Sequence, residues 1–444
     1  MTSRRFLFVT NRGPVVTGMD GTFRSAGGGL ASGLSGALAD SDSRWLFPIS
    51  APAELAAFES GRYLELDPKL IPTPVDPTSY TVAYEQVSNQ LLWFLFHGLF
   101  DLSMEPAFDH AFVRAFHAYR AVNQSIAVAV AAAAPGDVPI LVNDYHLMLV
   151  PGMLRKMGVD ASISFFLHTP FPYEHEFQLL PRWFKQELLT SLAAADLVCF
   201  HTERWRDNFL ASSPSAVATA VAPLPVNREA IDRARREENV ANRREALEKI
   251  FPGLPVITRV DRIEPSKNLL RGAMAVESLL ESRPKLAGQF GVLFFAYPSR
   301  QSLPRYQRLE RELVSLISGI NERWQRGSWR PIHLQVSDDT ARSLAAYQTF
   351  DTLLVNPVRD GLNLVVAEAA LLCPKSAQIV LSTEAGIADH LRGSVNLVNP
   401  LDVVETGEAL IGATGTDLDA VRDWVGANTW ERWFSAIDPR GNRG

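Results

Sequence analysis

Short apolar runs recur along the chain, and each of them ends abruptly in polar residues or in glycine. Runs of this kind are typical of buried parallel strands, whose C-terminal ends carry the binding loops of α/β domains. A first set spans residues 6–9, 140–142, 163–167 and 197–200, and a second set spans 256–260, 292–295, 353–355, 379–381 and 396–398. Segments with helical spacing separate the runs, for example 108–122 and 305–324. The alternation predicts two doubly wound α/β domains in tandem.

The boundary between the two predicted domains is expected near Pro223-Leu224-Pro225. The stretch 228–249 follows this boundary and holds seven basic and six acidic residues. Because the two signs nearly cancel, we interpret this stretch as a solvated helix rather than as a patch that binds nucleic acid.

The composition is that of an ordinary globular protein. Of the 444 residues, 47% are hydrophobic and 21% are charged, which argues against a disordered, collagen-like or coiled-coil chain. The net charge of -6 lacks the basic excess of proteins that bind nucleic acid or anionic membranes. The apolar run after Arg5 is too short for the core of a signal peptide, and the tract 126–134 is too short to cross a bilayer. We therefore expect a cytoplasmic protein that binds neither nucleic acid nor a membrane.

Patterns that would hold a metal are weak in this sequence. The two cysteines, Cys199 and Cys373, stand in apolar stretches, and none of the nine histidines forms a His-Glu-x-x-His pair. Asp40-Ser41-Asp42 fits a loose Asp-x-Asp pattern that some enzymes use to bind a metal and a nucleotide diphosphate. It lies in a turn rich in Ser and Asp, so the interpretation as a turn is favoured. We expect no metal site.

Three glycines at 27–29 precede a segment with apolar residues on one helical face. Consecutive glycines let backbone amides turn toward an anion, and the start of a helix adds partial positive charge. A turn without a ligand explains the glycines equally well, so the two interpretations stay open.

Two cations follow a strand of the second set. Arg262 and Lys267 lie five residues apart in the loop after 256–260. Two fixed cations at this place suit a diphosphate, because they neutralise the charge that builds on a departing phosphate. For either residue alone, a surface salt bridge to Glu264 is the simpler interpretation.

Carboxylates and histidines also follow predicted strands. Asp360 comes after 353–355, and Glu368 lies eight residues further on, near the start of a predicted helix. Glu368 can accept hydrogen bonds from ribose hydroxyls, although a carboxylate that only complements the helix dipole fits equally well. Asp144 follows 140–142 and His168 follows 163–167. A lone histidine beside an apolar run is more often a satisfied core residue than a catalyst.

Several longer motifs occur in a fixed order between Arg12 and about Trp433. They are Thr10-Asn11-Arg12-Gly13-Pro14, Gly27-Gly28-Gly29-Leu30, Ser88-Asn89 with Leu92-Trp93, Asp144-Tyr145-His146-Leu147-Met148-Leu149, Phe166-Leu167-His168-Thr169-Pro170-Phe171-Pro172, the segment Asp261 to Asn268, Pro298-Ser299-Arg300, and Arg359-Asp360-Gly361-Leu362-Asn363-Leu364-Val365. In order and spacing these motifs resemble the trehalose-phosphate synthase family of retaining glycosyltransferases. The resemblance covers nearly the whole chain, and its many ordered motifs make it specific.

The resemblance implies a GT-B architecture, in which two Rossmann-like, doubly wound domains face each other across a cleft. An acceptor domain is then expected at 1–224 and a nucleotide-sugar domain at 225–424. A C-terminal helix within 425–444 is expected to pack back on the first domain.

The resemblance also implies an activity, the transfer of glucose from a nucleotide-diphosphate glucose to glucose 6-phosphate with retention, giving trehalose 6-phosphate. No cofactor, no metal and no covalent enzyme intermediate are implied. The residues expected to bind the acceptor are Arg12, Trp45, Tyr84, Trp93, Asp144 and Arg300. The residues expected to bind the donor are Gly28, His168, Arg262, Lys267, Asp360, Gly361, Asn363, Leu364 and Glu368. Among them, the catalytic roles are expected of Arg262, Lys267, His168 and Asp360.

Some positions depart from the commoner pattern of the family. Glu264-Pro265 stands where Asp-Tyr is frequent, Asn268 where Gly is frequent, and Ala367 where Lys often precedes the ribose-binding Glu. These departures leave the base of the donor open between uridine and guanosine. A pseudo-sugar or another phosphorylated acceptor, and a sugar-phosphate sensor without activity, stay as alternatives. A homo-oligomer is also compatible with the sequence.

Overall fold

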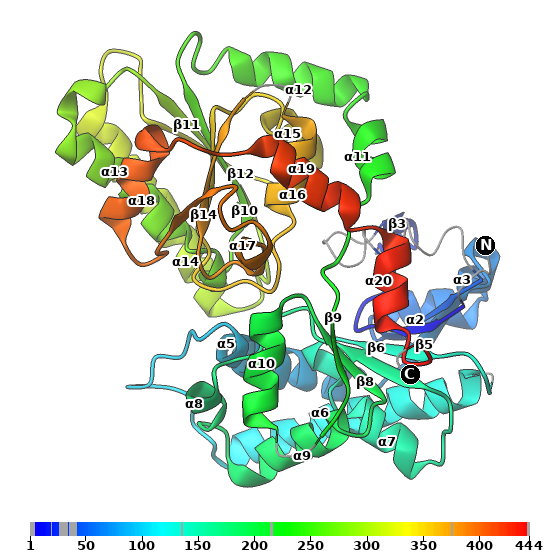
Figure 1. Ribbon diagram of the computed structural model, residues 1–444. Helices are drawn as coiled ribbons and strands as arrows, with labels where there is room; N and C mark the ends of the chain where they lie inside the picture. Colours follow the sequence, from blue (N-terminus) through cyan, green and yellow to red (C-terminus); the bar gives the residue numbers. More distant parts are fainter. Residues whose placement is uncertain are drawn as a thin grey trace. The chain divides into compact units, whose positions relative to one another are not determined.

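The computed structural model describes residues 5–18, 20–25, 34, 42–134, 136–213, 216–373 and 376–441. The chain divides into two compact units. The first unit comprises Met1–Pro225 together with Thr429–Gly444, and the second comprises Val226–Asn428. In Figure 1 the first unit runs from blue to green and includes the red C-terminal helix.

A parallel sheet forms the centre of the first unit. Within the described residues its strand order is β5-β4-β1-β6-β7-β8-β9. The strands are β1 (Leu7–Val9), β4 (Arg44–Ile49), β5 (Leu70–Pro74), β6 (Ile140–Asn143), β7 (Ile163–Phe166), β8 (Leu197–Phe200) and β9 (Thr219–Val221). The four apolar runs predicted for this unit became β1, β6, β7 and β8, and all residues of these strands are buried. Burial on both faces explains why they are apolar throughout. A separate antiparallel pair joins β2 (Val15–Thr17) to β3 (Phe23–Ser25).

Helices of the first unit cover its sheet (Figure 1). They are α2 (Pro52–Glu59), α3 (Arg62–Leu66), α4 (Pro77–Val82), the π-helix η1 (Ala83–Leu92), α5 (Trp93–Phe96), α6 (His110–Ala133), η2 (Tyr145–Leu147), α7 (Val150–Lys156), α8 (Glu174–Phe177), α9 (Arg182–Leu192), α10 (Glu203–Ser212) and α20 (Trp430–Ile437). Asp109 begins α6 by accepting a hydrogen bond of 2.9 Å from the amide of Phe112. The helix predicted at 108–122 is therefore the first half of α6. None of the described helices combines the length and apolarity that a membrane span requires.

The second unit is built on another parallel sheet, with the order β12-β11-β10-β13-β14-β15 among the described residues. Its strands are β10 (Val256–Arg262), β11 (Gly291–Tyr297), β12 (Ile332–Val336), β13 (Thr352–Val355), β14 (Gln378–Ser382) and β15 (Asn396–Val398). Numbered along the chain this order is 3-2-1-4-5-6, the strand order of the Rossmann fold. The predicted fold class of two Rossmann-like α/β domains is confirmed.

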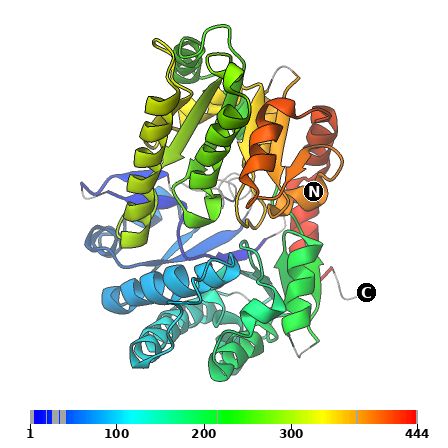
Figure 2. The same ribbon diagram turned by 90° about the vertical axis from the view of Figure 1, so that its left-hand side faces the viewer.

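Helices pack in two groups around the second sheet. They are α11 (Arg228–Ala234), α12 (Glu238–Glu248), η3 (Pro265–Lys267), α13 (Leu269–Ser282), η4 (Pro284–Leu286), α14 (Pro304–Trp324), α15 (Thr340–Ala346), α16 (Val365–Leu372), α17 (Gly386–His390), α18 (Val403–Gly412) and α19 (Leu418–Ala427). Helix α13 packs against α14 and α18 (Figure 2). Helix α16 packs against α11 and α19. Gly407 permits the close approach of α18, because a Cβ there would lie 2.6 Å from the carbonyl oxygen of Ala275. The charged stretch 228–249 forms two largely exposed helices, α11 and α12, rather than one.

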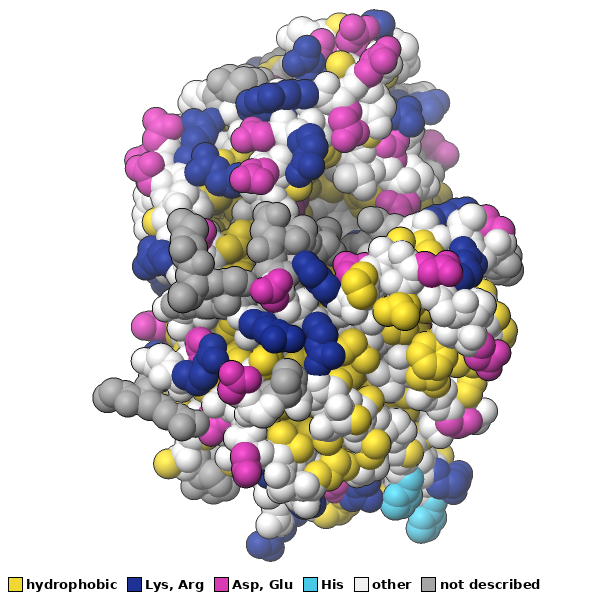
Figure 3. Space-filling view, turned by 90° about the vertical axis from the view of Figure 1, so that its right-hand side faces the viewer, with side chains coloured by type: hydrophobic (Ala, Val, Ile, Leu, Met, Phe, Trp, Pro, Cys, Tyr) yellow, Lys and Arg dark blue, Asp and Glu magenta, His cyan; other side chains and the backbone are white. Residues whose placement is uncertain are grey.

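The last helix, α20, belongs to the first unit. Its Phe434 stacks on Phe6 with 5.7 Å between ring centroids, and the side chain of Ser164 in β7 donates a hydrogen bond of 2.7 Å to the carbonyl oxygen of Ile437. On the face of the molecule shown in Figure 3, Lys and Arg side chains lie among Asp and Glu side chains. This mixture agrees with the near balance of 43 basic and 49 acidic residues.

Candidate active site

The point where the strand order of the second sheet reverses lies between β10 and β13, and ligands of open α/β sheets bind at such points. Lys267 follows β10, and its Nζ lies 2.5 Å from Oδ2 of Asp360, which follows β13. The side-chain amide of Asn363 donates a second hydrogen bond of 3.1 Å to the same oxygen. The Lys267 and Asp360 side chains are 13% and 17% exposed, so each can still be reached by a ligand. The structure thus brings together two of the predicted catalytic residues.

A buried ion pair between Arg259 and Asp261 supports the loop that carries Lys267. The guanidinium of Arg259 lies 3.0 Å from the carboxylate of Asp261 and donates hydrogen bonds to the side chain of Asn356 and to the backbone carbonyl of Lys267. Gly272 leaves room for this guanidinium, because a Cβ there would lie 2.2 Å from Nη1 of Arg259. Arg259 thus holds the backbone of Lys267, while Asp360 holds its side chain.

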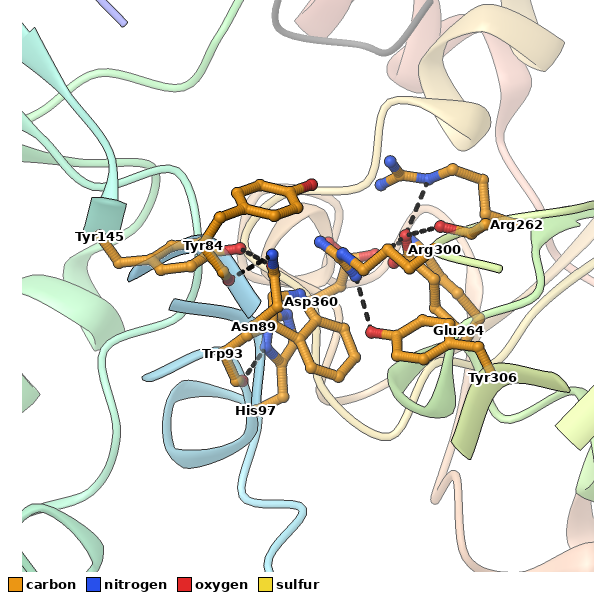
Figure 4. Close-up of polar contacts among 12 residues, drawn as sticks. Tyr84, Asn89, Trp93, His97, Tyr145, Arg262, Glu264, Arg300, Tyr306 and Asp360 are labelled. Carbon is orange, nitrogen blue, oxygen red and sulfur yellow. Dashed lines mark hydrogen bonds and ion pairs between the residues drawn. The ribbon is translucent and has the colours of Figure 1, made fainter. Parts of the chain in front are cut away.

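Arg262 and Arg300 share a buried carboxylate in the second unit. Nε of Arg262 and Nη1 of Arg300 each lie 3.4 Å from Oε1 of Glu264 (Figure 4). Arg300 also donates a hydrogen bond of 2.7 Å to the hydroxyl of Tyr306. The salt bridge between Arg262 and Glu264 that the sequence allowed is present. Glu264 is buried rather than exposed, however, and it has a second arginine as a partner.

Helix α16 begins beside these groups. Leu364 is its N-cap residue, and Asn363 stands just before it with φ of 77°, accepting a hydrogen bond of 3.2 Å from the amide of Val365. Gly361 packs tightly on Gly386, where a Cβ would lie 2.0 Å from the Gly361 carbonyl oxygen. In the first turn, burial raises the pKa of Glu368 to about 7. The predicted donor residues of this segment therefore surround one helix N-terminus, a place that favours an anion.

In the first unit, Arg12 and Tyr84 lie together. Arg12 donates a hydrogen bond to the hydroxyl of Tyr84, and its guanidinium carbon lies 5.5 Å from the centroid of the Tyr84 ring. The Tyr84 ring is stacked between Tyr80 and His146, at centroid distances of 5.9 and 5.8 Å. Tyr80 and His146 were not predicted as site residues. The spacing of four residues between Tyr80 and Tyr84 on a helix is the signal that would have indicated the first of them.

The two predicted tryptophans are buried. The indole N–H of Trp45 donates a hydrogen bond of 2.6 Å to Thr10, whose hydroxyl in turn donates one of 2.6 Å to the carbonyl of Arg12. Trp45 is 3% exposed and therefore reaches the predicted site only through Thr10. Trp93 is also 3% exposed and packs against the ring of His97, with 4.3 Å between centroids.

His168 and Asp144 lie at the C-terminal ends of β7 and β6. The amide of His168 donates a hydrogen bond of 3.2 Å to Oδ1 of Asp144, whose backbone has φ of 73°. Nδ1 of the His168 ring lies 3.3 Å from Nε2 of His201, and its Nε2 lies 3.0 Å from Oδ1 of Asn143. Both ring nitrogens of His168 therefore have protein partners, as the interpretation of a satisfied core histidine requires.

The protons of this histidine pair can be assigned. The amide of Leu224 donates to Nδ1 of His201, so this nitrogen is an acceptor and Nε2 carries the ring proton. His201 then donates to His168, and the Nε2–H of His168 donates to Asn143. Burial and the neighbouring His201 lower the pKa of His168 well below its ordinary value, which favours the neutral form of the His168 ring.

Two predicted elements lie outside the described residues. They are the glycine loop with Gly28, and Asp40 and Ser41 of the Asp-x-Asp pattern. Among the residues that the structure does describe, no group of three or more His, Cys, Asp or Glu side chains is placed to hold a metal ion.

The family model named Glycosyltransferase family 20 matches residues 5–219 and 213–423. The chain belongs to glycosyltransferase family 20. Members similar to it include an α,α-trehalose-phosphate synthase (UDP-forming) from Emericella nidulans, which is 33% identical over 433 residues and covers 91% of this chain and 84% of the relative. A bifunctional trehalose-6-phosphate synthase/phosphatase from Thermoproteus tenax is 30% identical, over 94% of this chain and 59% of the relative.

Solved structures agree with the family. A solved structure described as trehalose-6-phosphate from E. coli bound with UDP-2-fluoro glucose has a TM-score of 0.81 and 26% identity over 97% of both chains. An α,α-trehalose-phosphate synthase (UDP-forming) from Burkholderia xenovorans, in complex with glucose 6-phosphate, has a TM-score of 0.81 and 25% identity, over 97% of this chain and 98% of that chain. The family fold with two Rossmann-like domains and the enzyme class of a glycosyltransferase apply to this chain.

Proposed function

We propose that the protein transfers glucose from a nucleotide-diphosphate glucose to glucose 6-phosphate with retention, giving trehalose 6-phosphate. The observation that carries the proposal is the group of charges at the switch point of the second sheet. Arg262, Lys267 and Asp360 lie there, in a chain whose similar relatives are named trehalose-phosphate synthases.

The donor is proposed to bind to the second unit. Arg262 and Lys267 hold its diphosphate and stabilise the negative charge that develops on the leaving group. Gly361, Asn363 and Leu364 surround the N-terminus of α16, whose amides favour the same anion. Glu368 accepts hydrogen bonds from the ribose hydroxyls.

The transferred hexose is proposed to contact Asp360 and His168. Asp360 is held by Lys267 and Asn363, so its carboxylate is preorganised to accept hydrogen bonds from sugar hydroxyls. The ring nitrogens of His168 are engaged by His201 and Asn143, which fixes the ring in one orientation. Gly28 completes the proposed donor set, and it lies outside the described residues.

The acceptor is proposed to bind through its phosphate and its hydroxyls. Arg12 and Arg300 hold the phosphate, since guanidinium groups offer paired donors for phosphate oxygens. Tyr84 presents its hydroxyl beside Arg12, and Asp144 accepts from the sugar. Trp45 and Trp93 act from the core, by fixing the Arg12 loop and the end of the π-helix η1.

The reaction then needs no covalent enzyme intermediate. The bond between the anomeric carbon and the diphosphate breaks, the acceptor oxygen attacks the same face, and the leaving phosphate takes the acceptor proton. The protein orients the two substrates and stabilises the departing charge, and each effect can lower the barrier by roughly several kcal/mol.

Product analysis tests the proposal. Purified protein is incubated with UDP-glucose or GDP-glucose, combined with glucose 6-phosphate, other hexose 6-phosphates or free glucose, and the products are identified by mass spectrometry and NMR. We expect trehalose 6-phosphate with the α,α configuration, and an unchanged rate in excess chelator. Both bases are offered because the relatives are UDP-forming, whereas Pro265 and Ala367 depart from the common pattern.

Other outcomes of this assay identify the alternatives. A product only with a different phosphorylated acceptor would point to a relative with another specificity. Tight binding of glucose 6-phosphate without any turnover would instead identify a sugar-phosphate sensor. A rate that chelator abolishes and magnesium or manganese restores would show a metal requirement.

A further inference from the structure

Glu264 lies between two arginines at the C-terminal edge of the second sheet. Arg262 ends β10, and Ser299-Arg300 follow the adjacent strand β11. Oε1 of Glu264 lies 3.4 Å from Nε of Arg262 and 3.4 Å from Nη1 of Arg300 (Figure 4). The hydroxyl of Ser299 donates a hydrogen bond of 3.0 Å to the same oxygen. One carboxylate oxygen therefore has contacts with both guanidinium groups.

The Glu264 carboxylate is buried, and the positive charges around it keep it ionised. Its side chain is 3% exposed, whereas those of Arg300 and Arg262 are 15% and 53% exposed. Burial by itself raises the pKa of Glu264, but Arg262, Arg300 and Lys267 lower it to about 2. Glu264 is thus ionised at neutral pH.

Both arginines make long contacts with the Glu264 carboxylate. Charge-assisted hydrogen bonds between guanidinium and carboxylate are about 2.7–2.9 Å long, and both contacts to Glu264 are longer than this. The carboxylate therefore lies beside both guanidinium groups and balances their charge. Arg300 is further held by Tyr306 and has a backbone φ of 42°, a left-handed conformation that is rare outside glycine and typical of functional sites.

We propose that Glu264 is a positioning residue that couples the binding of the two substrates. The inference rests on the proposed function, in which Arg262 binds the donor diphosphate and Arg300 binds the acceptor phosphate. A phosphate on one arginine orders that guanidinium and with it the shared carboxylate. The second arginine then meets its own ligand in an ordered state, so the second substrate binds more tightly than it would alone.

Calorimetry on Glu264→Gln tests the coupling, because the amide keeps the size of the side chain and removes its charge. Binding of glucose 6-phosphate is measured without and with a saturating nucleoside diphosphate, of the base that supports turnover. In the wild-type protein we expect the diphosphate to tighten this binding at least about fivefold. In Glu264→Gln the gain falls below about twofold, and kcat/KM falls at least about tenfold.

Conservative and control variants separate positioning from folding. Glu264→Asp keeps the charge and should retain the coupling. Glu408→Gln removes a carboxylate that pairs with Arg283 on the surface of the same unit and should leave both coupling and turnover unchanged. Ser299→Ala frees the Glu264 carboxylate without removing its charge, and it should reduce the coupling at least about twofold.

Three results would overturn the inference. They are independent binding of the two ligands in the wild-type protein, full coupling in Glu264→Gln, and, should that variant not fold, full coupling in Ser299→Ala. Failure of the proposed function is a different result, because the wild-type protein would then form no product with either glucose nucleotide and glucose 6-phosphate.

Discussion

Lys267 shows how neighbours set the charge of a single residue. Burial alone lowers the pKa of its ammonium group, but Asp360 and Asp261 outweigh this and raise the pKa above its ordinary value. Lys267 therefore stays protonated throughout the working pH range. Its Nζ is paired with Asp360 and its backbone carbonyl is held by Arg259, so the charge is positioned before any ligand binds. A preorganised charge of this kind stabilises an oxyanion more than one that must first reorient.

Removing this charge should reduce turnover. We expect Lys267→Ala or Arg262→Ala to lower kcat at least about tenfold, because loss of one preorganised donor to a developing oxyanion typically costs ~3 kcal/mol. Steady-state kinetics at saturating donor measure the loss, and circular dichroism checks the fold. Near-normal turnover in either variant would contradict its assignment to the diphosphate. Arg323→Ala, which removes an exposed partner of Glu277, is the control.

Glu368 should make donor binding depend on pH. Its pKa is raised by burial to about 7, so the carboxyl is largely protonated at pH 6 and ionised at pH 8. Only the carboxylate accepts hydrogen bonds from both ribose hydroxyls, so the KM for the donor should fall as the pH rises through 7. Glu368→Gln should remove this dependence. A wild-type KM for the donor that is constant from pH 6 to 8 would show that Glu368 does not contact the ribose.

The raised pKa of Glu368 also affects the stability of the fold. A rise in pH should improve donor binding but lower this stability. The folded state holds the proton of Glu368 more tightly than the unfolded chain, where the ordinary pKa is 4.5. The contribution is fully present below pH 4.5 and is lost as the pH rises through 7. Relative to wild type, Glu368→Gln should therefore gain stability between these values, as measured by thermal unfolding at several pH values.

At the scale of elements, the π-helix η1 determines where the predicted acceptor residues lie. It spans Ala83–Leu92, carries Tyr84 and ends where Trp93 begins α5. The side-chain amide of Asn89 donates a hydrogen bond of 2.8 Å to the carbonyl of Tyr84, five residues earlier, and accepts one of 3.1 Å from the hydroxyl of Tyr145. Figure 4 shows the side chain of Asn89 in contact with both tyrosines. π-Helices are rare in proteins as a whole, but those that occur are frequently found at functional sites.

Asn89→Ala should shift Tyr84 relative to Trp93, because both hydrogen bonds that hold the wide turn are lost. We expect the KM for glucose 6-phosphate to rise at least about fivefold and the stability to fall by about 1–3 kcal/mol. Asn208→Ala is the matched control, since Asn208 also donates one side-chain hydrogen bond to a backbone carbonyl in the first unit. Equal effects of the two variants on KM would show that Asn89 has only a structural role.

At the scale of the whole molecule, the two units share one arrangement of strands. In each, the first parallel strand lies inside the sheet, β1 beside β6 and β10 beside β13. Arg12 follows β1 and Asp144 follows β6, while Arg262 ends β10 and Asp360 follows β13. Each switch point thus carries an arginine and an aspartate, as expected if each unit binds one phosphorylated ligand.

Arg12 and Arg300 come from different units, and we expect both to act on the phosphate of the acceptor. Each Ala substitution should lower kcat/KM for glucose 6-phosphate far more than for free glucose. Because residues that share one partner are coupled, the two losses should not add. A double-mutant cycle with both acceptors measures this. Additive losses, or equal losses for the phosphorylated and the free sugar, would show that the arginines do not share the phosphate.

The sequence by itself determined the fold class and the enzyme class. Strands that are buried on both faces must be apolar throughout, so the runs that became β1, β6, β7 and β8 were visible without a structure. The residues at their ends were visible too, because loops at the C-terminal ends of parallel strands carry polar groups. The ordered motifs identified the family that the comparisons confirm.

Only the tertiary structure decided how these residues are paired. Arg259 with Asp261, His168 with His201, and Glu264 with Arg300 depend on strand register and on the loops that join the strands. Burial then sets the strength of each pair and the protonation of Glu368, since the cost of a charge depends on how much water the packed chain excludes. Neither the burial of a side chain nor the register of its strand is encoded in the local sequence. At Glu264, a salt bridge on the surface and a buried carboxylate shared by two arginines therefore cannot be told apart from the sequence alone.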